Sequence, residues 1–405
     1  MTDGPSSLPS SSPLASAWSL DSSVVYLNHG SFGATLRSVL QYQSELRARL
    51  EREPVHFLDR ELEGLLDGVH DALGPFLGAH PDDLAAVPNA TSGVNTVVRS
   101  LDFGPGDELL TTDHAYHACA NALRYVASRT GAKVVTAKVP FPLPGPETVV
   151  EAVMGAVTAR TRLVLLDHVT SQTGLIFPVE RLVPLLQGRG VDVLVDGAHA
   201  PGMVPLELDA LGAAYYTANC HKWLCTPKGA AFLHVRRDRQ KQIHPLTISH
   251  GLDTPRTDRS HFRVEFDWCG TSDPTAWLCV PAALQALSKL VRGGWPEVMT
   301  RNHQLALSAR QMLCAALDIP PPCPESMLGS LAAVPLPAGD GRPRPPPGLD
   351  PLQDALFHRK SVEVPVFNWP ARPARCLRVS AQLYNSPEQY AFLARAVTEL
   401  LAEGV

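Results

Sequence analysis

The sequence predicts a large three-layer α/β domain with a mostly parallel sheet, followed by a smaller α+β domain. From residue 84 to about residue 235, short apolar runs alternate with amphipathic stretches of about ten to fifteen residues, as in buried strands connected by helices. Beyond residue 270 the pattern is mainly helical, with few apolar runs of strand length. The chain has 405 residues and 45% hydrophobic content, which is enough material for a core of this size.

The larger domain is expected over residues 21–270. Its predicted strands are the apolar runs within DLAAVPN, ELLTTD, KVVTAKV, RLVLLDHV, VDVLVDGAH, AAYYTANC and AAFLHVR. The stretches between them that carry helical periodicity are GVNTVVRSL, HACANALRYVASRTG, PETVVEAVMGAVT and VERLVPLLQGRG. Glycine-containing FGPGD and GRG supply the expected turns.

The smaller domain is expected over residues 271–405, where TAWLCVPAALQALSKLV and TRNHQLALSARQMLCAAL carry helical patterns. A proline-rich connector over 319–351 follows, and then the apolar run VEVPVF, the strand ARCLRVS and a final helix from Pro387. At the other end of the chain, the Ser/Pro-rich residues 1–20 are expected to form a disordered arm. This arm lacks the basic start and long apolar stretch of a secretion signal.

Composition excludes several classes of partner. A formal net charge of -5 argues against a nucleic acid or an anionic membrane bound through bulk electrostatics. No run approaches the roughly 18 apolar residues that cross a bilayer. The eight cysteines include no C-x-x-C pair, so neither a zinc ribbon nor a disulfide framework is expected, and a reducing cytoplasm fits best.

Polar residues gather where the apolar runs stop. Ligands of open α/β sheets bind outside the carboxyl ends of the strands, so these residues are expected to form one site. They are Asn89, Ala90, Thr91, Ser92, Asp113, His114, Asp167, His168, Thr170, Ser171, Asp196, His199, Asn219, His221 and Lys222.

Three parts of this set have distinct chemistry. The small residues of NATSGVN open a helix whose backbone N–H groups suit a phosphate, although Thr91 or Ser92 could serve only as a helix cap. Asp196 ends an apolar strand, so its carboxylate needs a cationic partner such as a protonated heterocyclic nitrogen or a metal ion, unless it only caps the following turn. Lys222 lies 222 − 196 = 26 residues further on, between a histidine and a tryptophan.

Lys222 is the informative member of the set. A desolvated lysine near other cations has a lowered pKa and becomes a Schiff-base former, whereas a lysine in an ordinary loop points to water. A phosphate cradle, an acid for a ring nitrogen and an amine for an aldehyde are together the groups that hold pyridoxal 5′-phosphate (PLP). The sequence therefore predicts PLP as the cofactor.

The sequence resembles the class V (fold-type I) PLP enzymes and, within them, isopenicillin N epimerase-like proteins. The resemblance covers nearly the whole chain, and YLNHGSFG and HKWLCTPKG are its most specific stretches. The other matching motifs are NATSGVN, LLTTDHAY, LDHVTSQTG, VDGAHAPG, CGTSDPTAWL and LRVSAQLYNSPEQ.

The resemblance implies roles for individual residues. Lys222 would form the imine with the cofactor, and Asp196 would pair with the pyridine nitrogen. His199 would lie near the phenolic oxygen or the reacting carbons. His114 matches the position at which class V enzymes stack an imidazole on the pyridine face, and Tyr116 is a nearby candidate acid.

Further roles concern the phosphate and the substrate. Thr271 matches a residue that a partner subunit lends to the phosphate, which implies a homodimer with shared sites. Arg378 matches the arginine that binds the substrate α-carboxylate, and Asn28 is expected to help it. The residues expected to bind the cofactor, chiefly at its phosphate, are Ala90, Thr91, Ser92, Thr170, Asn219 and His221.

The sequence does not decide between several reactions of such an enzyme. Epimerisation needs Lys222 and a second acid or base, for which His114, Tyr116 and His199 are candidates. A C–S lyase of the ergothioneine-pathway type needs only one base, and a class V aminotransferase is a further alternative. A desulfurase is disfavoured because Glu363 stands about where those enzymes carry a cysteine. The resemblance favours the epimerase.

Two other classes of function are weaker. A divalent metal for hydrolysis would leave Lys222 as an uncompensated cation, and no i, i+4 histidine pair supports it. Its ligands would come from Asp113, His114, His117, His168, Asp196 and His199. A catalytically inactive regulator with a PLP fold would have lost a key group, and each expected group is present.

Overall fold

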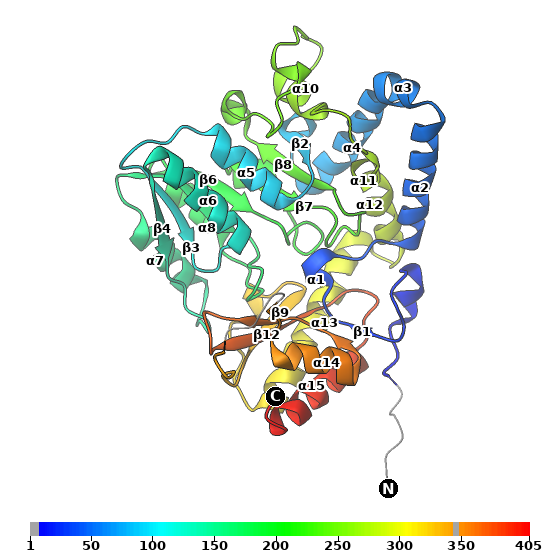
Figure 1. Ribbon diagram of the computed structural model, residues 1–405, viewed down its shortest axis with the longest axis vertical. Coiled ribbons are helices and arrows are strands. Elements are labelled where there is room, and N and C mark those ends of the chain that lie inside the picture. The colour runs from blue at the N-terminus through cyan, green and yellow to red at the C-terminus, as the bar shows by residue number, and fades with distance from the viewer. Residues whose placement is uncertain (1–7, 343–347) are drawn as a thin grey trace.

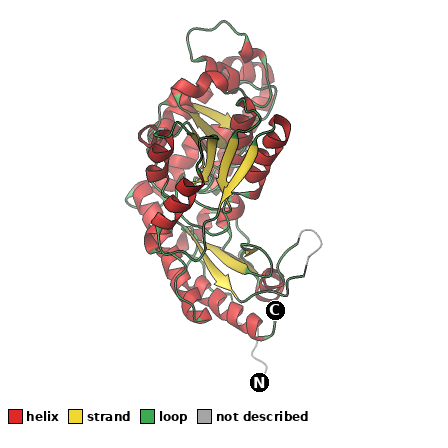
Figure 2. Cartoon of the chain, turned by 90° about the vertical axis from the view of Figure 1, so that its left-hand side faces the viewer, coloured by secondary structure: helices red, strands yellow, loops and turns green. Residues whose placement is uncertain are grey.

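The computed structural model describes residues 8–342 and 348–405 (Figure 1). A large domain is built on a seven-stranded sheet, and a smaller domain on a three-stranded sheet lies below it in the view of Figure 1. Figure 2 shows helices on both sides of the large sheet. The predicted three-layer α/β fold with a second, smaller α+β unit is confirmed.

The large sheet has the strand order β2-β8-β7-β6-β5-β3-β4. Strands β3 to β7 run parallel, and β8 is antiparallel to both of its neighbours. Because helices cover both faces, the inner strands are buried on both sides, which is why their sequences show continuous apolar runs rather than alternation. The strands are β2 (Leu84–Val87), β3 (Glu108–Thr112), β4 (Lys133–Ala137), β5 (Thr161–Asp167), β6 (Asp192–Asp196), β7 (Tyr215–Asn219) and β8 (Ala231–Val235).

Alternate residues of the central strands belong to two separate cores. Leu165 and Leu194 pack in a cluster with residues of α5 and α6, whereas Val164 and Val193 pack with residues of α7 and α8. This two-residue alternation places one helical layer on each face of the sheet. The helices of this domain are α5 (Ala90–Ser100), α6 (His117–Thr130), α7 (Pro146–Ala156), α8 (Val179–Gln187), α9 (Leu208–Leu211) and α10 (His261–Asp267).

The described part of the expected disordered arm is ordered, which corrects that expectation. Residues 13–17 form a 3-10 helix, and Trp18 is 1% exposed. The Trp18 indole donates to the Ala34 carbonyl at 3.2 Å and packs edge-on against Tyr384. Burial of one large aromatic ring therefore holds this Ser/Pro-rich segment on the C-terminal domain. Residues 1–7 of the expected arm lie outside the described residues.

The segments before β2 are mostly helical: β1 (Val25–Tyr26), α1 (His29–Phe32), α2 (Arg37–Arg52), α3 (Pro54–His56), a π-helical turn (Phe57–Glu61) and α4 (Leu62–Leu77). β1 pairs in parallel with β10 near the other end of the chain. Segments near the beginning and the end of the sequence thereby meet in the smaller domain, where Figure 1 shows β1 near β12. None of the helices in the described ranges combines the length and apolarity needed to cross a membrane.

The C-terminal elements are α11 (Thr275–Leu278), α12 (Val280–Lys289), α13 (Gly294–Leu317), β9 (Leu331–Leu336), α14 (Pro351–Lys360), β10 (Val362–Glu363), β11 (Val366–Asn368), β12 (Arg375–Ser380) and α15 (Pro387–Ala402). The smaller sheet has the order β11-β12-β9 and is antiparallel. The expected connector over 319–351 contains β9, so it is not purely a linker; its residues 343–347 lie outside the described ranges. α11 and α12 pack against α2 and α4 rather than against the smaller sheet.

One close packing contact leads to a prediction. A Cβ on Gly93 of α5 would lie 2.0 Å from Thr217 Oγ1 on β7. We expect Gly93→Ala to lower the free energy of unfolding by about 1–3 kcal/mol, because α5 must move away from the sheet. Gly68→Ala on the exposed face of α4, where no atom lies within 4 Å of the added Cβ, is the matched control and should stabilise the protein by about 0.5–1 kcal/mol. Denaturant unfolding of both variants checks this; a Gly93 variant as stable as the parent would contradict it.

Candidate active site

A cavity of about 590 Å³ lies at the carboxyl ends of the parallel strands. Residues that follow β2, β3, β5, β6 and β7 line it, among them Ala90, Tyr116, Asp167, Asp196 and Lys222. Ser31 and Phe32 of α1 complete the wall from the N-terminal segment. The polar strand ends singled out in the sequence therefore do form a single site, although not with every predicted member.

One end of the cavity is built from the start of α5. Asn89 caps this helix by accepting a hydrogen bond from the Ser92 N–H at 2.8 Å. The Ala90 N–H donates to Asn219 Oδ1 at 2.9 Å, which ties the helix start to the end of β7. Ala90, Thr91, Ser92, Asn219 and His221 all line the cavity, as predicted. Small side chains and the positive end of a helix dipole suit a phosphate group here.

Two buried carboxyl groups lie on neighbouring strands. Asp196 ends β6 and Asp167 ends β5, and they are partners in the strand register. Burial raises the pKa of Asp196, although hydrogen bonds from the Cys119 thiol at 3.1 Å and the Ala198 N–H at 3.0 Å oppose the shift. Burial and the Asp196 charge raise the pKa of Asp167 well above its usual range.

Neither of these carboxyl groups has an arginine or lysine salt-bridge partner among the described residues. Buried carboxylates of this kind favour a cation that enters the cavity. A protonated ring nitrogen is such a cation, so the residues present fit the predicted cofactor.

Lys222 follows β7, and its Nζ lies 3.1 Å from His199 Nε2. Its pKa is lowered to about 7, first because the cavity removes the ammonium group from water and then because the Arg378 charge lies nearby; Asp196 opposes the shift. Such an amine is largely neutral just above neutral pH and can attack a carbonyl carbon. His199 is 1% exposed and also accepts a hydrogen bond from the Trp223 indole at 3.4 Å.

Arg378 projects from β12 and is 1% exposed. Its guanidinium donates to Ser31 Oγ at 3.1 Å, to Asn28 Oδ1 at 3.3 Å and to the Ser171 carbonyl. Its Nε is buried without a partner among the described residues, and burial lowers the pKa of the group to about 10. No carboxylate of the described chain forms a salt bridge with it, which leaves a buried cation suited to a substrate carboxylate.

His114, which was expected to stack on the cofactor, does not line the cavity of this structure. Its Nδ1 lies 2.7 Å from Thr173 Oγ1 and its Nε2 lies 2.9 Å from the Val139 carbonyl, so both ring nitrogens are occupied away from the cavity. Tyr116, two residues further along the turn after β3, lines the cavity instead and is 48% exposed. The turn between β3 and α6 decides which side chain faces inward, and sequence patterns do not specify that turn.

Two other predicted cofactor residues lie outside the cavity of their own chain. The Thr170 hydroxyl lies 2.7 Å from Thr173 Oγ1 and accepts from the Leu175 N–H, so it holds a turn; Ser171 lines the cavity in its place. Thr271 is exposed in the segment between α10 and α11. Sequence reasoning also missed Lys228, which lines the cavity and donates to the Gly33 carbonyl at 3.1 Å.

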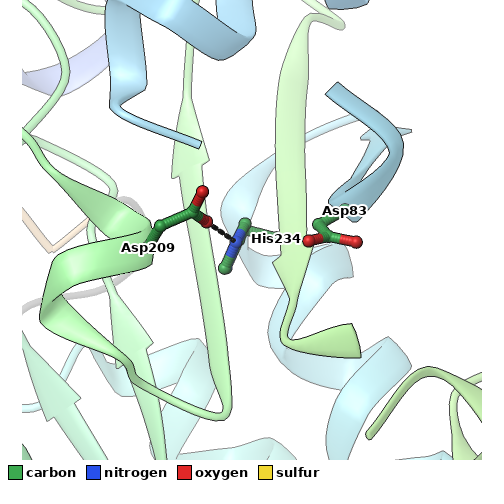
Figure 3. A group of neighbouring side chains, drawn as sticks. All are labelled: Asp83, Asp209 and His234. Carbon is green, nitrogen blue, oxygen red and sulfur yellow. Dashed lines mark hydrogen bonds and ion pairs between the residues drawn. The ribbon is translucent and has the colours of Figure 1, made fainter. Parts of the chain in front are cut away.

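The metal-hydrolase alternative is not supported by the positions of its residues. His168 is bonded to the Tyr216 hydroxyl at 2.8 Å, and Asp113 accepts from the Val139 N–H at 3.0 Å, both away from the cavity. Among the described residues, the group with metal-binding spacing is a different one, formed by Asp83, Asp209 and His234 (Figure 3). That group lies outside the cavity, and its Asp83 is engaged by Arg237 and Gln240.

Comparison with known proteins is consistent with this geometry. The family model Aminotransferase class-V matches residues 31–320. An isopenicillin N epimerase of Amycolatopsis lactamdurans is 36% identical, with 96% of this chain and 99% of that protein covered. A probable chloroplastic L-cysteine desulfhydrase of Arabidopsis thaliana is 29% identical over 93% of this chain and 83% of its own length. A cysteine desulfurase structure from Thermococcus onnurineus NA1 has the same fold, with a TM-score of 0.78, 19% identity and coverage of 98% and 100%.

The lowered pKa of Lys222 predicts a pH dependence. The neutral amine is the attacking form, so the rate at which the cofactor-free protein captures added PLP should rise with pH and be half-maximal near pH 7. An ordinary lysine, with a pKa of about 10.4, would give a rate that still climbs at pH 9. Stopped-flow absorbance at graded pH measures this rate. A rate that keeps rising through pH 9 would refute the lowered pKa.

Proposed function

The chain is a pyridoxal 5′-phosphate enzyme of the class V aminotransferase family, and on that premise we propose that it epimerises an amino acid at Cα. The isopenicillin N epimerase relative, similar over nearly the full length of both chains, supports this reaction class. The observation that carries the proposal is that an amine and a phenol, those of Lys222 and Tyr116, line the same cavity.

The cavity residues have clear roles towards the cofactor. The start of α5 with Asn219 and His221 would hold the phosphate, Asp196 would keep the ring nitrogen protonated, and Lys222 would bind the aldehyde carbon. When bound, the cofactor withdraws electrons from the Cα of an attached amino acid and thereby acidifies its hydrogen. Everything else in the reaction falls to the protein's own groups.

Arg378 is proposed to bind the α-carboxylate of the substrate. Its planar guanidinium can form two parallel hydrogen bonds to a carboxylate. Asn28 helps to place it: the Asn28 amide donates to Glu363 Oε1 at 3.0 Å, which turns its oxygen towards Arg378. Ser31 supports the same nitrogen. With the carboxylate fixed there, Cα stays within the cavity next to Lys222.

Lys222 and Tyr116 enter the cavity from different sides of Asp196. Lys222 follows β7 and Tyr116 follows β3, while β6 with Asp196 lies between these two strands in the sheet. Tyr116 also lies close enough to Arg378 for a negative charge on its oxygen to favour the charged guanidinium. Of the other candidates, His114 is outside the cavity and His199 is on the Lys222 side. We therefore assign proton removal to one of this pair and proton return to the other.

We also propose that the protein is a homodimer and that it works in the cytoplasm. A homodimer in which Thr271 reaches the partner's phosphate site is supported by the exposure of Thr271 and by its neighbours Gly270 and Ser272, which line a groove beside the cavity. A reducing cytoplasm is supported by eight cysteines, all within the described ranges, that form no disulfide.

A C–S lyase is the second candidate. It is favoured by the 29% identical desulfhydrase relative and by chemistry, since elimination needs only Lys222 as base. A cysteine desulfurase remains disfavoured. Cys376 is buried in β12, and burial raises the pKa of its thiol to about 12, so it is a poor nucleophile.

Incubation with L- and D-amino acids, S-substituted cysteines included, in deuterated water tests the reaction. We expect deuterium at Cα together with loss of chirality. Pyruvate with a released thiol or sulfenate would instead establish the lyase, and transfer of the amino group to a keto acid would establish the aminotransferase. Lys222→Ala should be colourless and inert, and a yellow, active variant would refute the cofactor assignment.

The assignment of proton transfer to Lys222 and Tyr116 can be tested separately. Tyr116→Phe should reduce epimerisation by about 10²- to 10⁴-fold, the usual contribution of one acid or base. Exchange of the Cα hydrogen should survive for the enantiomer whose proton Lys222 removes. Proton NMR of each enantiomer in deuterated water separates the two processes. Equal loss of exchange from both enantiomers would contradict the assignment of Tyr116.

The carboxylate site gives a binding prediction. Arg378→Lys should raise KM for the amino acid by about 10- to 100-fold, because an ammonium group cannot form the paired hydrogen bonds of a guanidinium. Arg359→Lys, at an exposed ion pair with Glu403, is the matched control and should leave KM unchanged. Steady-state kinetics of both variants measure the effect. Similar KM values for Arg378→Lys and the parent would place the carboxylate elsewhere.

A further inference from the structure

A chain of hydrogen bonds leads from the Trp223 indole through His199 to the Lys222 amine. Trp223 is 1% exposed, and its Nε1 lies 3.4 Å from His199 Nδ1. The other ring nitrogen of His199, Nε2, lies 3.1 Å from Lys222 Nζ. Trp223 is therefore linked to the amine of the preceding residue, Lys222, through a histidine that lies 23 residues before that lysine in the sequence.

The chemistry of the three groups fixes the direction of both bonds. An indole N–H can only donate, so His199 Nδ1 must accept and carries no hydrogen. A neutral imidazole then has its hydrogen on Nε2, which must donate. An ammonium group has no lone pair to accept with, so the nitrogen that receives this bond is a neutral amine.

We infer that Trp223 is a positioning residue for the cofactor lysine: it fixes His199 in the tautomer that donates to Lys222 Nζ, and thereby favours the neutral, nucleophilic amine. The inference rests on the role proposed for Lys222. It gives a function to the tryptophan of the HKWLCTPKG motif, which has no other role in the proposed reaction.

The indole is itself held in place. The His29 ring packs against it with centroids 4.8 Å apart. His29 Nε2 lies 3.0 Å from the Lys222 carbonyl, which can only accept, so this nitrogen carries the hydrogen and Nδ1 accepts from the Tyr384 hydroxyl at 3.0 Å. The YLNHGSFG motif thus fixes both the backbone of Lys222 and the ring that orients His199.

The other charges around the pair agree with this arrangement. Burial, the Lys222 and Arg378 charges, His29 and His221 all lower the pKa of His199, so it stays neutral and one nitrogen can accept. Around Lys222, Arg378 disfavours the ammonium form while Asp196 and Cys119 favour it. Burial is the largest cause that disfavours the ammonium form, and a hydrogen bond donated by His199 acts in the same direction.

Labelling of Lys222 tests the inference without any reliance on catalysis. The full-length protein, freed of PLP, is treated with an amine-selective acylating reagent at graded pH, and the Lys222 peptide is quantified by mass spectrometry. The parent should show half-maximal reactivity near pH 7. In Trp223→Phe the loss of one hydrogen bond should lower the acid dissociation constant of Lys222 about fivefold, so the midpoint should move upwards by about 0.7 pH unit. Labelling at pH 7 should then fall about threefold.

Trp277→Phe is the matched control. Trp277 is also buried, but its indole nitrogen has no partner among the described residues, so the Lys222 midpoint should not change. Equal midpoints for Trp223→Phe and the parent would overturn the inference, while a colourless Lys222→Ala would still uphold the cofactor assignment. The two failures are therefore distinguishable.

A measurement on the unsubstituted protein covers the case in which Trp223→Phe does not fold. Nitrogen-15 NMR of histidine-labelled protein reports which ring nitrogen of His199 carries the hydrogen, and the signal is assigned by its loss in His199→Gln. We expect a protonated Nε2 and a bare Nδ1. The opposite tautomer would overturn the inference.

Discussion

The desolvation of one lysine is the constraint on which the rest of the site depends. Lys222 cannot keep an ordinary ammonium group in this cavity, because burial and the nearby Arg378 both disfavour it. The partly opposing charge of Asp196 is itself buried and is shared between a thiol donor and a backbone N–H. The amine therefore loses its proton easily and has a free lone pair. This lone pair can attack a carbonyl carbon, as in the formation of an imine with an aldehyde.

The fold meets this constraint by joining distant parts of the chain. β1 pairs with β10, which brings the YLNHGSFG segment between the large sheet and β12. Gly33 of this segment has φ +70, and a Cβ there would lie 1.9 Å from the His221 carbonyl. The N-terminal segment thus packs directly on the backbone of the lysine while Asn28 and Ser31 face Arg378.

The same arrangement places the groups proposed for the substrate and those proposed for the cofactor in different domains. Arg378 comes from the smaller sheet and the proposed cofactor residues come from the larger one, so we expect substrate and cofactor to be held by different domains. The groups proposed to move the Cα proton stand at the ends of β7 and β3. This division leaves the reaction outcome to a few side chains around Cα, which accounts for epimerases and desulfhydrases among similar proteins.

By itself the sequence determined the layers and the seven strands, because continuous apolar runs are the direct imprint of buried strands. It also singled out Lys222, Asp196 and Arg378 as candidates, because charged residues at the ends of such runs or within them are unusual. The tertiary structure alone decided that Tyr116 rather than His114 faces the cavity, that Ser171 replaces Thr170, and that Trp18 orders the N-terminal arm. The contacts from Trp223 through His199 to Lys222 also appeared only there. Turn geometry and contacts between distant segments set these features, and neither has a period or spacing that the sequence displays.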